Sequence, residues 1–313
     1  MYKALNFFYF LFFAIFFISC SDSKFAKKKN RNSHLEQASS FDNYLQKGKL
    51  DSARIYIDSL YKINPNDKEL LTNRGEIYFL LNDFEVAEKS WLSCISIDVN
   101  NEACYEKLIG LYCGIYDLMD DNCRDIIHKT FNVNENNDIA LFFKSKRFVE
   151  KNKIPEAIGL YEKLLKNDTT NLRVLNELAV LYDTNFQAEF YYKKMLELDS
   201  SYVAFYGLGM YFQEKELFEK AIDNYKQALT IKQKEEPNYN IGYCYLMMNL
   251  VDKAVDSFSN AISIDASYLE AYFARGFSYT KLNKNKLAIE DYKFCLMLEP
   301  GFEDARIQLE KLK

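Results

Sequence analysis

The chain has 313 residues, a formal net charge of −5 and a high aromatic content of 16%. Its 10 glycines and 4 prolines are few, and this scarcity disfavours an all-β chain with many turns. An acidic chain also lacks the excess of basic residues that neutralises phosphates in nucleic-acid binding, so no nucleic-acid partner is predicted.

Residues 1–19 read as an export signal. Lys3 precedes an apolar run from Ala4 to Ile18, which at about 15 residues is shorter than the roughly 20 that a bilayer span needs. The following Ser19-Cys20-Ser21 resembles a bacterial lipobox, in which the cysteine is acylated and becomes the first mature residue. This resemblance implies a lipoprotein signal peptide over 1–19, lipidation of Cys20 and membrane attachment through the N-terminus. An uncleaved N-terminal anchor is the alternative.

Residues 20–33 are polar and contain a basic cluster between Lys24 and Arg31. We interpret them as a flexible tether between the lipid and the folded part. Several acyl chains on one cysteine are ample for stable anchoring, whereas a single chain is marginal. In some Gram-negative bacteria, a residue other than Asp after the acylated cysteine favours delivery to the outer membrane. By resemblance to this rule, we expect the protein in the cell envelope, lipid-anchored at the outer membrane.

From residue 34 onward, apolar residues recur at helical spacing and the pattern repeats itself. The clearest stretch runs from Glu235 to Pro300, where the glycines Gly242 and Gly276 and the alanines Ala254 and Ala288 are each 34 residues apart. This period marks a helical-hairpin repeat and resembles the tetratricopeptide repeat (TPR) family. The resemblance implies an all-α fold: a right-handed α-solenoid of about eight TPR hairpins over 34–302, closed by a capping helix at 303–313.

The predicted hairpins differ in regularity. The second, sixth, seventh and eighth show the family pattern clearly, and the first, third, fourth and fifth match it more weakly. The fifth hairpin is shortened, because its small residues Ala179 and Ala188 are 9 positions apart rather than 12. Other helical solenoids are the main alternative: Sel1-like repeats are richer in glycine, and pentatricopeptide repeats bind RNA through a basic groove.

The sequence shows no recognisable catalytic or metal-binding motif. It contains two histidines, His34 and His128, and no HExxH, CxxC, GxSxG, Walker A or GxGxxG pattern. We therefore predict a protein that is not an enzyme, with no catalytic residues, no metal site and no cofactor. A hydrolase that uses a carboxylate pair is a weaker alternative.

The six cysteines other than Cys20 fall into two groups, and Cys104, Cys113 and Cys123 form the second, in the third hairpin. Cys104 and Cys113 are nine positions apart on one predicted helix, about 13 Å, which is too far for a bond. Cys94, Cys244 and Cys295 occupy helix-packing positions, where cysteine behaves as a small hydrophobic residue. Cys113 and Cys123 flank a predicted turn, and in an oxidising compartment a disulfide between them is a hypothesis, with free thiols as the alternative.

In the TPR family the first helix of each hairpin lines a concave face where ligands dock. By this resemblance, the sixth to eighth hairpins form a partner-binding groove. The predicted groove residues are Tyr206, Met210, Tyr239, Tyr243, Met247, Phe273 and Phe277. Aromatic and methionine side chains suit the apolar anchors of peptide ligands; the alternative is that they pack between repeats. The Lys/Asn/Arg carboxylate clamp of chaperone-binding TPR proteins is not found, so no C-terminal carboxylate ligand is predicted.

These features predict a membrane-anchored scaffold or adaptor of the bacterial cell envelope, which binds protein or peptide ligands through the concave TPR groove. The alternative is a docking or glycan-binding module that works with a peptidoglycan-active enzyme, because tyrosine-rich grooves also stack against sugars.

Overall fold

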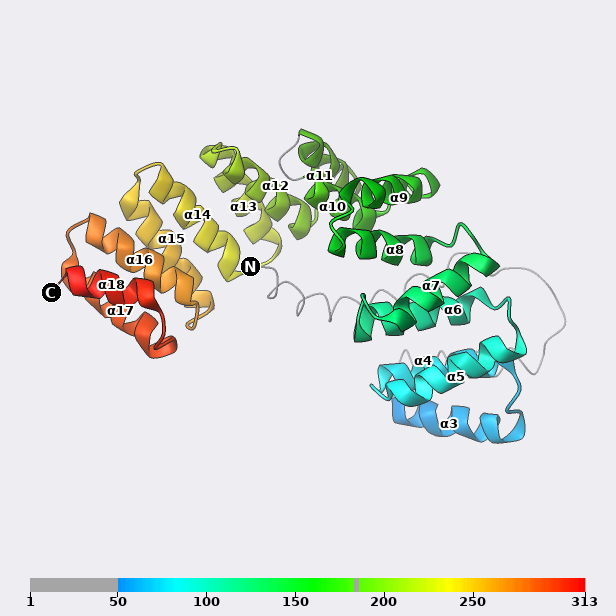
Figure 1. The fold of residues 1–313 in the computed structure, drawn as a ribbon. Helices are drawn as coiled ribbons and strands as arrows, with labels where there is room; N and C mark the ends of the chain where they lie inside the picture. Colours follow the sequence, from blue (N-terminus) through cyan, green and yellow to red (C-terminus); the bar gives the residue numbers. More distant parts are fainter. Residues whose placement is uncertain (1–49, 183–185, 313) are drawn as a thin grey trace. The chain divides into compact units, whose positions relative to one another are not determined.

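The computed structural model describes residues 50–182 and 186–312, which form sixteen α-helices and one π-helix, with no strand in these ranges (Figure 1). The all-α class predicted from the sequence is thereby confirmed. The predicted signal peptide, the tether with Cys20, and the first helix of the first hairpin lie outside the described residues.

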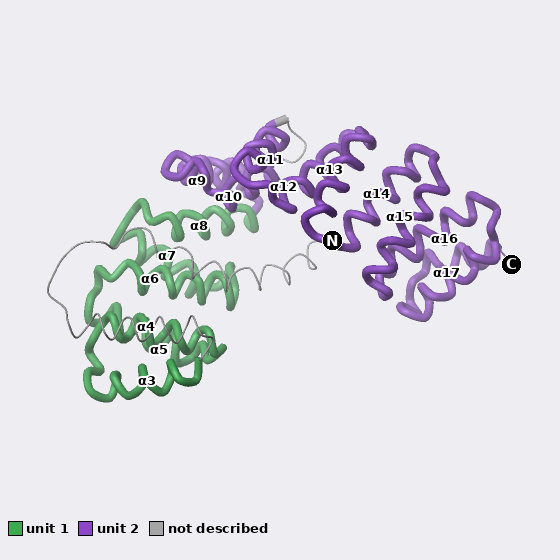
Figure 2. Tube along the Cα trace, turned by 180° about the vertical axis from the view of Figure 1, so that it is seen from behind, with its two compact units in different colours: residues 1–151 green, residues 152–313 purple. Residues whose placement is uncertain are grey.

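The chain divides into two compact units, 1–151 and 152–313 (Figure 2). From residue 50 onward, the helices of unit 1 are α3 (Leu50–Ile63), α4 (Lys68–Leu80), α5 (Phe84–Ile97), α6 (Glu102–Ile109), the π-helix η1 (Gly110–Tyr116), α7 (Asp121–Val133) and α8 (Asp138–Glu150). The helices of unit 2 are α9 (Ile154–Asn167), α10 (Leu172–Leu181), α11 (Phe186–Leu198), α12 (Tyr202–Glu214), α13 (Phe218–Ile231), α14 (Glu235–Met247), α15 (Val251–Ile264), α16 (Leu269–Lys281), α17 (Asn285–Leu298) and α18 (Glu303–Lys311).

Several helices begin at a residue whose side chain accepts a hydrogen bond from a free N–H of the first turn. In unit 1, Asp67 accepts bonds from the backbone nitrogens of Glu69 and Leu70, and Asn137 caps α8 in the same way. In unit 2, Ser201 caps α12 through the backbone nitrogen of Ala204. These polar residues fix where each helix starts.

The turn inside most hairpins uses one residue with a left-handed backbone. The residues are Asn82, Asn152, Glu216, Asn249 and Asn283, with φ values between 56° and 61°. Asparagine tolerates this conformation better than glutamate, whose longer side chain gains no local hydrogen bond there.

Glu216→Asn is therefore expected to raise the free energy of unfolding by about 0.5–1 kcal/mol, because it relieves the left-handed strain between α12 and α13. Urea unfolding followed by circular dichroism measures the change. The matched control is Asn249→Glu, which places the same strain in the next hairpin and should destabilise by a similar amount. Equal stability of all three proteins would contradict the expectation.

A glycine of the first helix faces an aromatic ring of the second helix in the regular hairpins. The pairs are Gly75 with Trp91, Gly209 with Tyr225, Gly242 with Phe258, and Gly276 with Tyr292. A Cβ on Gly242 would come 2.6 Å from the ring of Phe258, so even alanine does not fit without movement. These four rings are at most 1% exposed and form the centre of each hairpin.

The third, fourth and fifth hairpins lack this glycine, and the fourth has the buried Ser145 in its place. In the third, Ile109 stands where the glycine is expected, and the first helix changes there from α6 into the π-helix η1 instead of continuing as the predicted α-helix. Such π-segments accommodate an extra residue in a helix. In the fifth, α10 has 10 residues whereas α12 has 13, in line with the shortening predicted from the alanine spacing.

The last helix covers the end of unit 2. Ala305 is fully buried and packs in one cluster with Tyr292 and Cys295 of α17, and Leu309 and Leu312 lie against it. The remaining surface of α18 is largely charged, as suits a terminal helix of a repeat array.

Candidate functional site

The candidate site is the surface of unit 2 formed by α12, α14 and α16, the first helices of three successive hairpins. We call this surface the A-face. All seven groove residues predicted from the sequence lie on these three helices. They divide into an inner row and an outer row.

The inner row consists of Tyr206, Tyr239 and Phe273, each three residues before the helix glycine. Their ring centroids lie 5.6, 5.6 and 5.7 Å from the second-helix rings that face those glycines, with tilts of 52°, 49° and 51°. The repeated geometry shows that the inner row packs within its own hairpin and forms a partly buried floor. Aromatic pairs at this separation add stability beyond the area that they bury.

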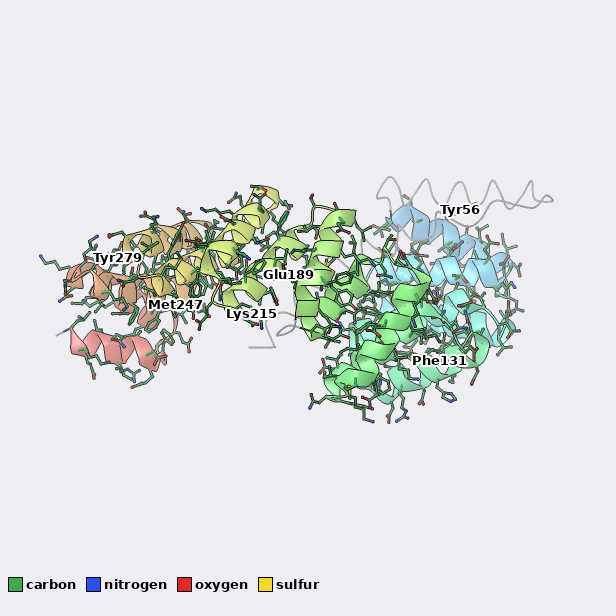
Figure 3. All side chains as sticks on the ribbon, turned by 90° about the horizontal axis from the view of Figure 1, so that it is seen from above. Tyr56, Phe131, Glu189, Lys215, Met247 and Tyr279 are labelled. Atoms are coloured by element: carbon green, nitrogen blue, oxygen red, sulfur yellow. A yellow bond between two sulfur atoms is a disulfide. The ribbon has the colours of Figure 1, made fainter. Side chains whose placement is uncertain are left out.

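The outer row consists of Met210, Tyr243, Met247 and Phe277. The side chains of Met210, Tyr243 and Met247 are 44%, 37% and 53% exposed, and Figure 3 labels Met247. Phe277 is partly buried, and the Lys281 ammonium lies 5.3 Å from its ring centroid. Exposed apolar side chains on a stiff helical floor give an adaptable surface for apolar ligand groups.

Tyrosine hydroxyls add polar groups to the floor. Asn240 Nδ2 donates a hydrogen bond of 3.1 Å to the Tyr206 hydroxyl, which joins α14 to α12. The ring of Tyr202 stacks on Tyr206 with centroids 5.7 Å apart. Burial raises the pKa of Tyr206 and of Tyr239, so both hydroxyls remain protonated at neutral pH.

Two acidic residues of the A-face are missing from the sequence-based prediction, which considered aromatic and methionine residues. Glu236 and Glu270 each lie six positions before the helix glycine, in the first turns of α14 and α16. A carboxylate is favoured at a helix N-terminus by the unpaired N–H groups there. Alignment of the repeats on their glycines would have identified both residues.

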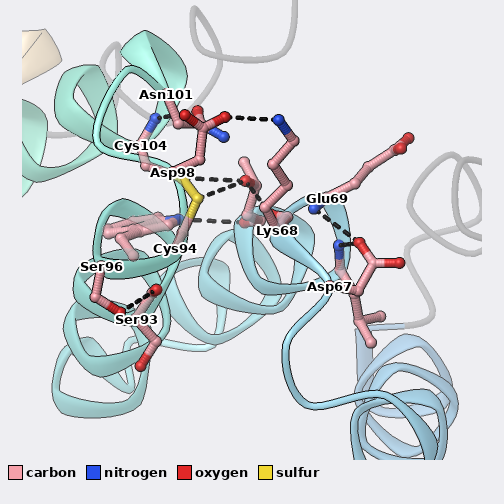
Figure 4. The surroundings of a disulfide bond; sticks show 12 residues. Asp67, Lys68, Glu69, Ser93, Cys94, Ser96, Asp98, Asn101 and Cys104 are labelled. Atoms are coloured by element: carbon pink, nitrogen blue, oxygen red, sulfur yellow. Dashed lines mark hydrogen bonds and ion pairs between the residues drawn. A yellow bond between two sulfur atoms is a disulfide. The ribbon is translucent and has the colours of Figure 1, made fainter.

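Unit 1 contains two disulfides. The Cys113–Cys123 bond suggested by the sequence is present, with Cα atoms 4.9 Å apart. Cys94, which we expected to be a free packing residue, is instead bonded to Cys104, with Cα atoms 6.6 Å apart (Figure 4). Cys244 and Cys295 are free and buried, as expected of packing residues.

The repeat pattern explains the pairing of Cys94 with Cys104. In the seventh and eighth hairpins the corresponding positions hold Ala261 and Ala271, both fully buried. These positions bring the end of a second helix against the start of the next first helix. Two cysteines there lie close enough to bond.

Arg147 is a further buried polar residue that the sequence did not reveal. Its side chain is 7% exposed, and Nη1 donates hydrogen bonds to the carbonyl oxygens of Leu118 and Asp120. Burial lowers the pKa of Arg147. The guanidinium therefore holds the turn between η1 and α7, a structural role inside unit 1.

Within 50–182 and 186–312, no three His, Cys, Asp or Glu side chains gather in a way that would hold a metal ion. None of the helices described there combines the length and the apolar character needed to cross a bilayer.

Comparisons with known proteins support the repeat assignment. Residues 202–235, 236–268 and 269–302 match the family profile described as Tetratricopeptide repeat. No curated protein matches the chain.

Solved structures share the helical architecture. Cut9–Hcn1, an APC/C hetero-tetramer, has a TM-score of 0.56 at 14% identity and covers 87% of this chain and 54% of its own. Yeast Tom70 has a TM-score of 0.52 at 14% identity, with 84% and 58% covered. MamA is 28% identical over 50% of this chain and 94% of its own, with a TM-score of 0.47.

At these identities the likeness to Cut9 and Tom70 shows the fold alone: an all-helical solenoid of TPR type. The family profile adds the identity of the hairpins that carry the A-face. Residues 202–302 are three tetratricopeptide repeats, a module that serves as a scaffold for protein–protein interaction.

Proposed function

We propose that the protein is a membrane-anchored scaffold of the bacterial cell envelope that binds a protein partner on the A-face of unit 2. The observation that carries this proposal is the outer row. Met210, Tyr243 and Met247 remain exposed although the inner row below them is packed against the rings of the second helices. Preformed apolar anchors of this kind lower the ordering cost of binding.

The outer row can be tested separately from the inner row. Tyr243→Ala with Met247→Ala is expected to weaken partner capture at least tenfold, because two apolar anchors are lost from the binding surface. Crosslinking and pull-down from native membranes, followed by affinity measurement with the captured partner, checks this result. The free energy of unfolding should stay within about 0.5 kcal/mol of the original, since both side chains are exposed.

Met297→Ala is the matched control for this test. Met297 is 65% exposed on α17, a second helix, so its truncation removes a similar side chain outside the A-face. Unchanged capture by the Tyr243→Ala/Met247→Ala protein, or equal loss in the Met297→Ala protein, would contradict the proposed binding surface.

Attachment to the membrane is assigned to acylation of Cys20. The support is the apolar run that precedes Ser19-Cys20-Ser21, together with the two disulfides, since such bonds persist in oxidising compartments outside the cytoplasm. The outer membrane is the proposed location.

Cys20→Ser is expected to release the protein from the membrane fraction, because the acyl chains provide the attachment. Membrane fractionation and mass spectrometry of the N-terminal peptide measure the outcome. A protein that stays membrane-bound after this substitution would instead be held by an uncleaved N-terminal helix.

Glycan binding is the second candidate, with the chain serving as a docking module for a peptidoglycan-active enzyme. Tyr243 is 37% exposed beside the protonated hydroxyl of Tyr239, so the surface offers both a stacking face and a hydrogen-bond donor. Muropeptide binding that is lost in Tyr243→Ala would favour this function over a protein partner.

A further inference from the structure

The acidic residues of the A-face lie along one edge of it. Glu236 and Glu270 occupy equivalent positions near the N-terminal ends of α14 and α16. Tyr268 directly precedes α16, and its ring is 5.4 Å from that of Tyr239 on α14. Burial is the main cause that raises the pKa of Tyr268; the charge of Glu270 comes next, and that of Glu236 contributes less than the neighbouring tyrosines. The two carboxylates therefore border a shared aromatic floor.

One of these carboxylates is incompletely paired. Oε2 of Glu236 is buried and receives no hydrogen bond from any residue in the described ranges. Its other oxygen, Oε1, lies 3.6 Å from Nζ of Lys234, a long contact for an ion pair. The Glu236 side chain as a whole is 35% exposed, so its carboxylate can turn toward a basic group of a ligand and gain the donor that Oε2 lacks.

The exposed apolar residues form a parallel edge. Tyr243 follows Glu236 by seven positions, which places it about two helical turns, or 10 Å, further along α14. Met247 lies one turn beyond, and Met210 occupies on α12 the position of Tyr243. A ligand that crosses the three helices therefore meets carboxylates on one side and apolar groups on the other.

We infer that the partner binds the A-face through a polypeptide segment that has Lys or Arg side chains on one edge and apolar side chains on the other. This inference rests on the proposed function. The basic groups pair with Glu236 and Glu270 and lie against the tyrosine rings. The apolar groups contact Met210, Tyr243 and Met247. The net charge of −5 favours approach of the same segment and opposes an acidic one.

A peptide selection tests this inference. Displayed random peptides of about 12 residues, long enough to cross three helices spaced about 10 Å apart, are selected on the full-length protein in detergent. Peptides that also bind the Met210→Ala/Tyr243→Ala/Met247→Ala protein are discarded. The remaining set is expected to combine Lys or Arg with Leu, Met or aromatic residues.

The role of the carboxylates is then measured with one selected peptide. Glu236→Gln with Glu270→Gln should weaken its binding about tenfold at low salt, with a smaller difference at high salt because the ion pairs are screened. The matched control is Glu219→Gln with Glu290→Gln, which removes two exposed carboxylates from second helices and should leave affinity unchanged.

The outcomes separate this inference from the proposed function. Peptides that depend on the outer row but lack basic residues would overturn the inference and leave peptide binding by the A-face intact. Basic peptides that bind the Glu236→Gln/Glu270→Gln protein equally well would overturn it too. If no peptide depends on the outer row, the proposed function fails together with the inference.

Discussion

Reduction of both disulfides is expected to lower the stability of unit 1 by about 5 kcal/mol. Each bond joins cysteines 10 positions apart, and closure of a loop of that length in the unfolded chain contributes about 2.7 kcal/mol. The Cys94–Cys104 bond joins α5 of the second hairpin to α6 of the third, and the Cys113–Cys123 bond joins η1 to α7 within the third. Their loss therefore acts on the hairpin whose helices are the least regular.

Trp91 provides the measurement. It is the only tryptophan of the chain, is 1% exposed, and lies in α5 three residues before Cys94. Its fluorescence during urea unfolding should report a lower midpoint when a reductant is present. An unchanged midpoint would show that neither bond contributes to folding of this region.

Alanine substitutions separate the cross-link from the packing. Cys94→Ala with Cys104→Ala gives unit 1 the residues that Ala261 and Ala271 already provide at the same repeat positions. The small side chains still fit there, so most of the expected loss of about 2.7 kcal/mol comes from the missing bond. In this variant the reductant should lower the midpoint only through Cys113–Cys123.

The hairpins were predictable from the sequence because their geometry depends on a few small residues. Gly242 and Gly276 leave room for an aromatic ring, and no larger residue does so without displacement. A period of 34 in these positions therefore specifies both helices of the hairpin and the face that each buries. In the third hairpin Ile109 removes that room, and the π-helix that follows has no periodic signal in the sequence.

The division of the A-face into two rows was not predictable from spacing alone. Tyr206 and Met210 are four positions apart, so they lie on one stripe of α12, separated by about 40° and 6 Å. Spacing assigns both to the same surface. Only the packed structure shows that Tyr206 lies 5.6 Å from the Tyr225 ring while Met210 remains 44% exposed.

The partners of a buried ion pair in the last hairpin were likewise not predictable from the sequence. Arg74 and Arg275 each precede a helix glycine, yet their partners differ: Arg74 pairs with Asp58 of the preceding hairpin, whereas Arg275 pairs with Asp291 of its own. In each case Nη1 donates to a serine: Arg74 to Ser90 of its own hairpin, and Arg275 to Ser259 of the preceding hairpin. The Arg-Gly dipeptide was visible in the sequence. Each arginine, however, has a possible partner 16 positions before it and another 16 positions after it, and only the folded structure shows which of them is the carboxylate.

Asp291→Ala is expected to cost about 3 kcal/mol in unit 2. Asp291 is 5% exposed and accepts two hydrogen bonds from Arg275, of 2.9 and 2.7 Å. The guanidinium side chain is 19% exposed, so its removal from water is incomplete and the cost falls near the lower end for a broken buried pair. Asp58→Ala should cost less, because the Asp58 side chain is 29% exposed.

The decisive comparison is the double substitution Asp291→Ala with Arg275→Met. It removes the stranded charge and leaves an apolar side chain of similar length, so most of the lost stability should return. Hydrogen exchange in α16 and α17 measures the local free energy of opening in all three proteins. A double variant as unstable as Asp291→Ala would mean that the carboxylate stabilises the hairpin through contacts other than Arg275. Because α16 carries Glu270 and Phe277, recovery of its rigidity should also restore peptide binding, which links the ion pair to the shape of the A-face.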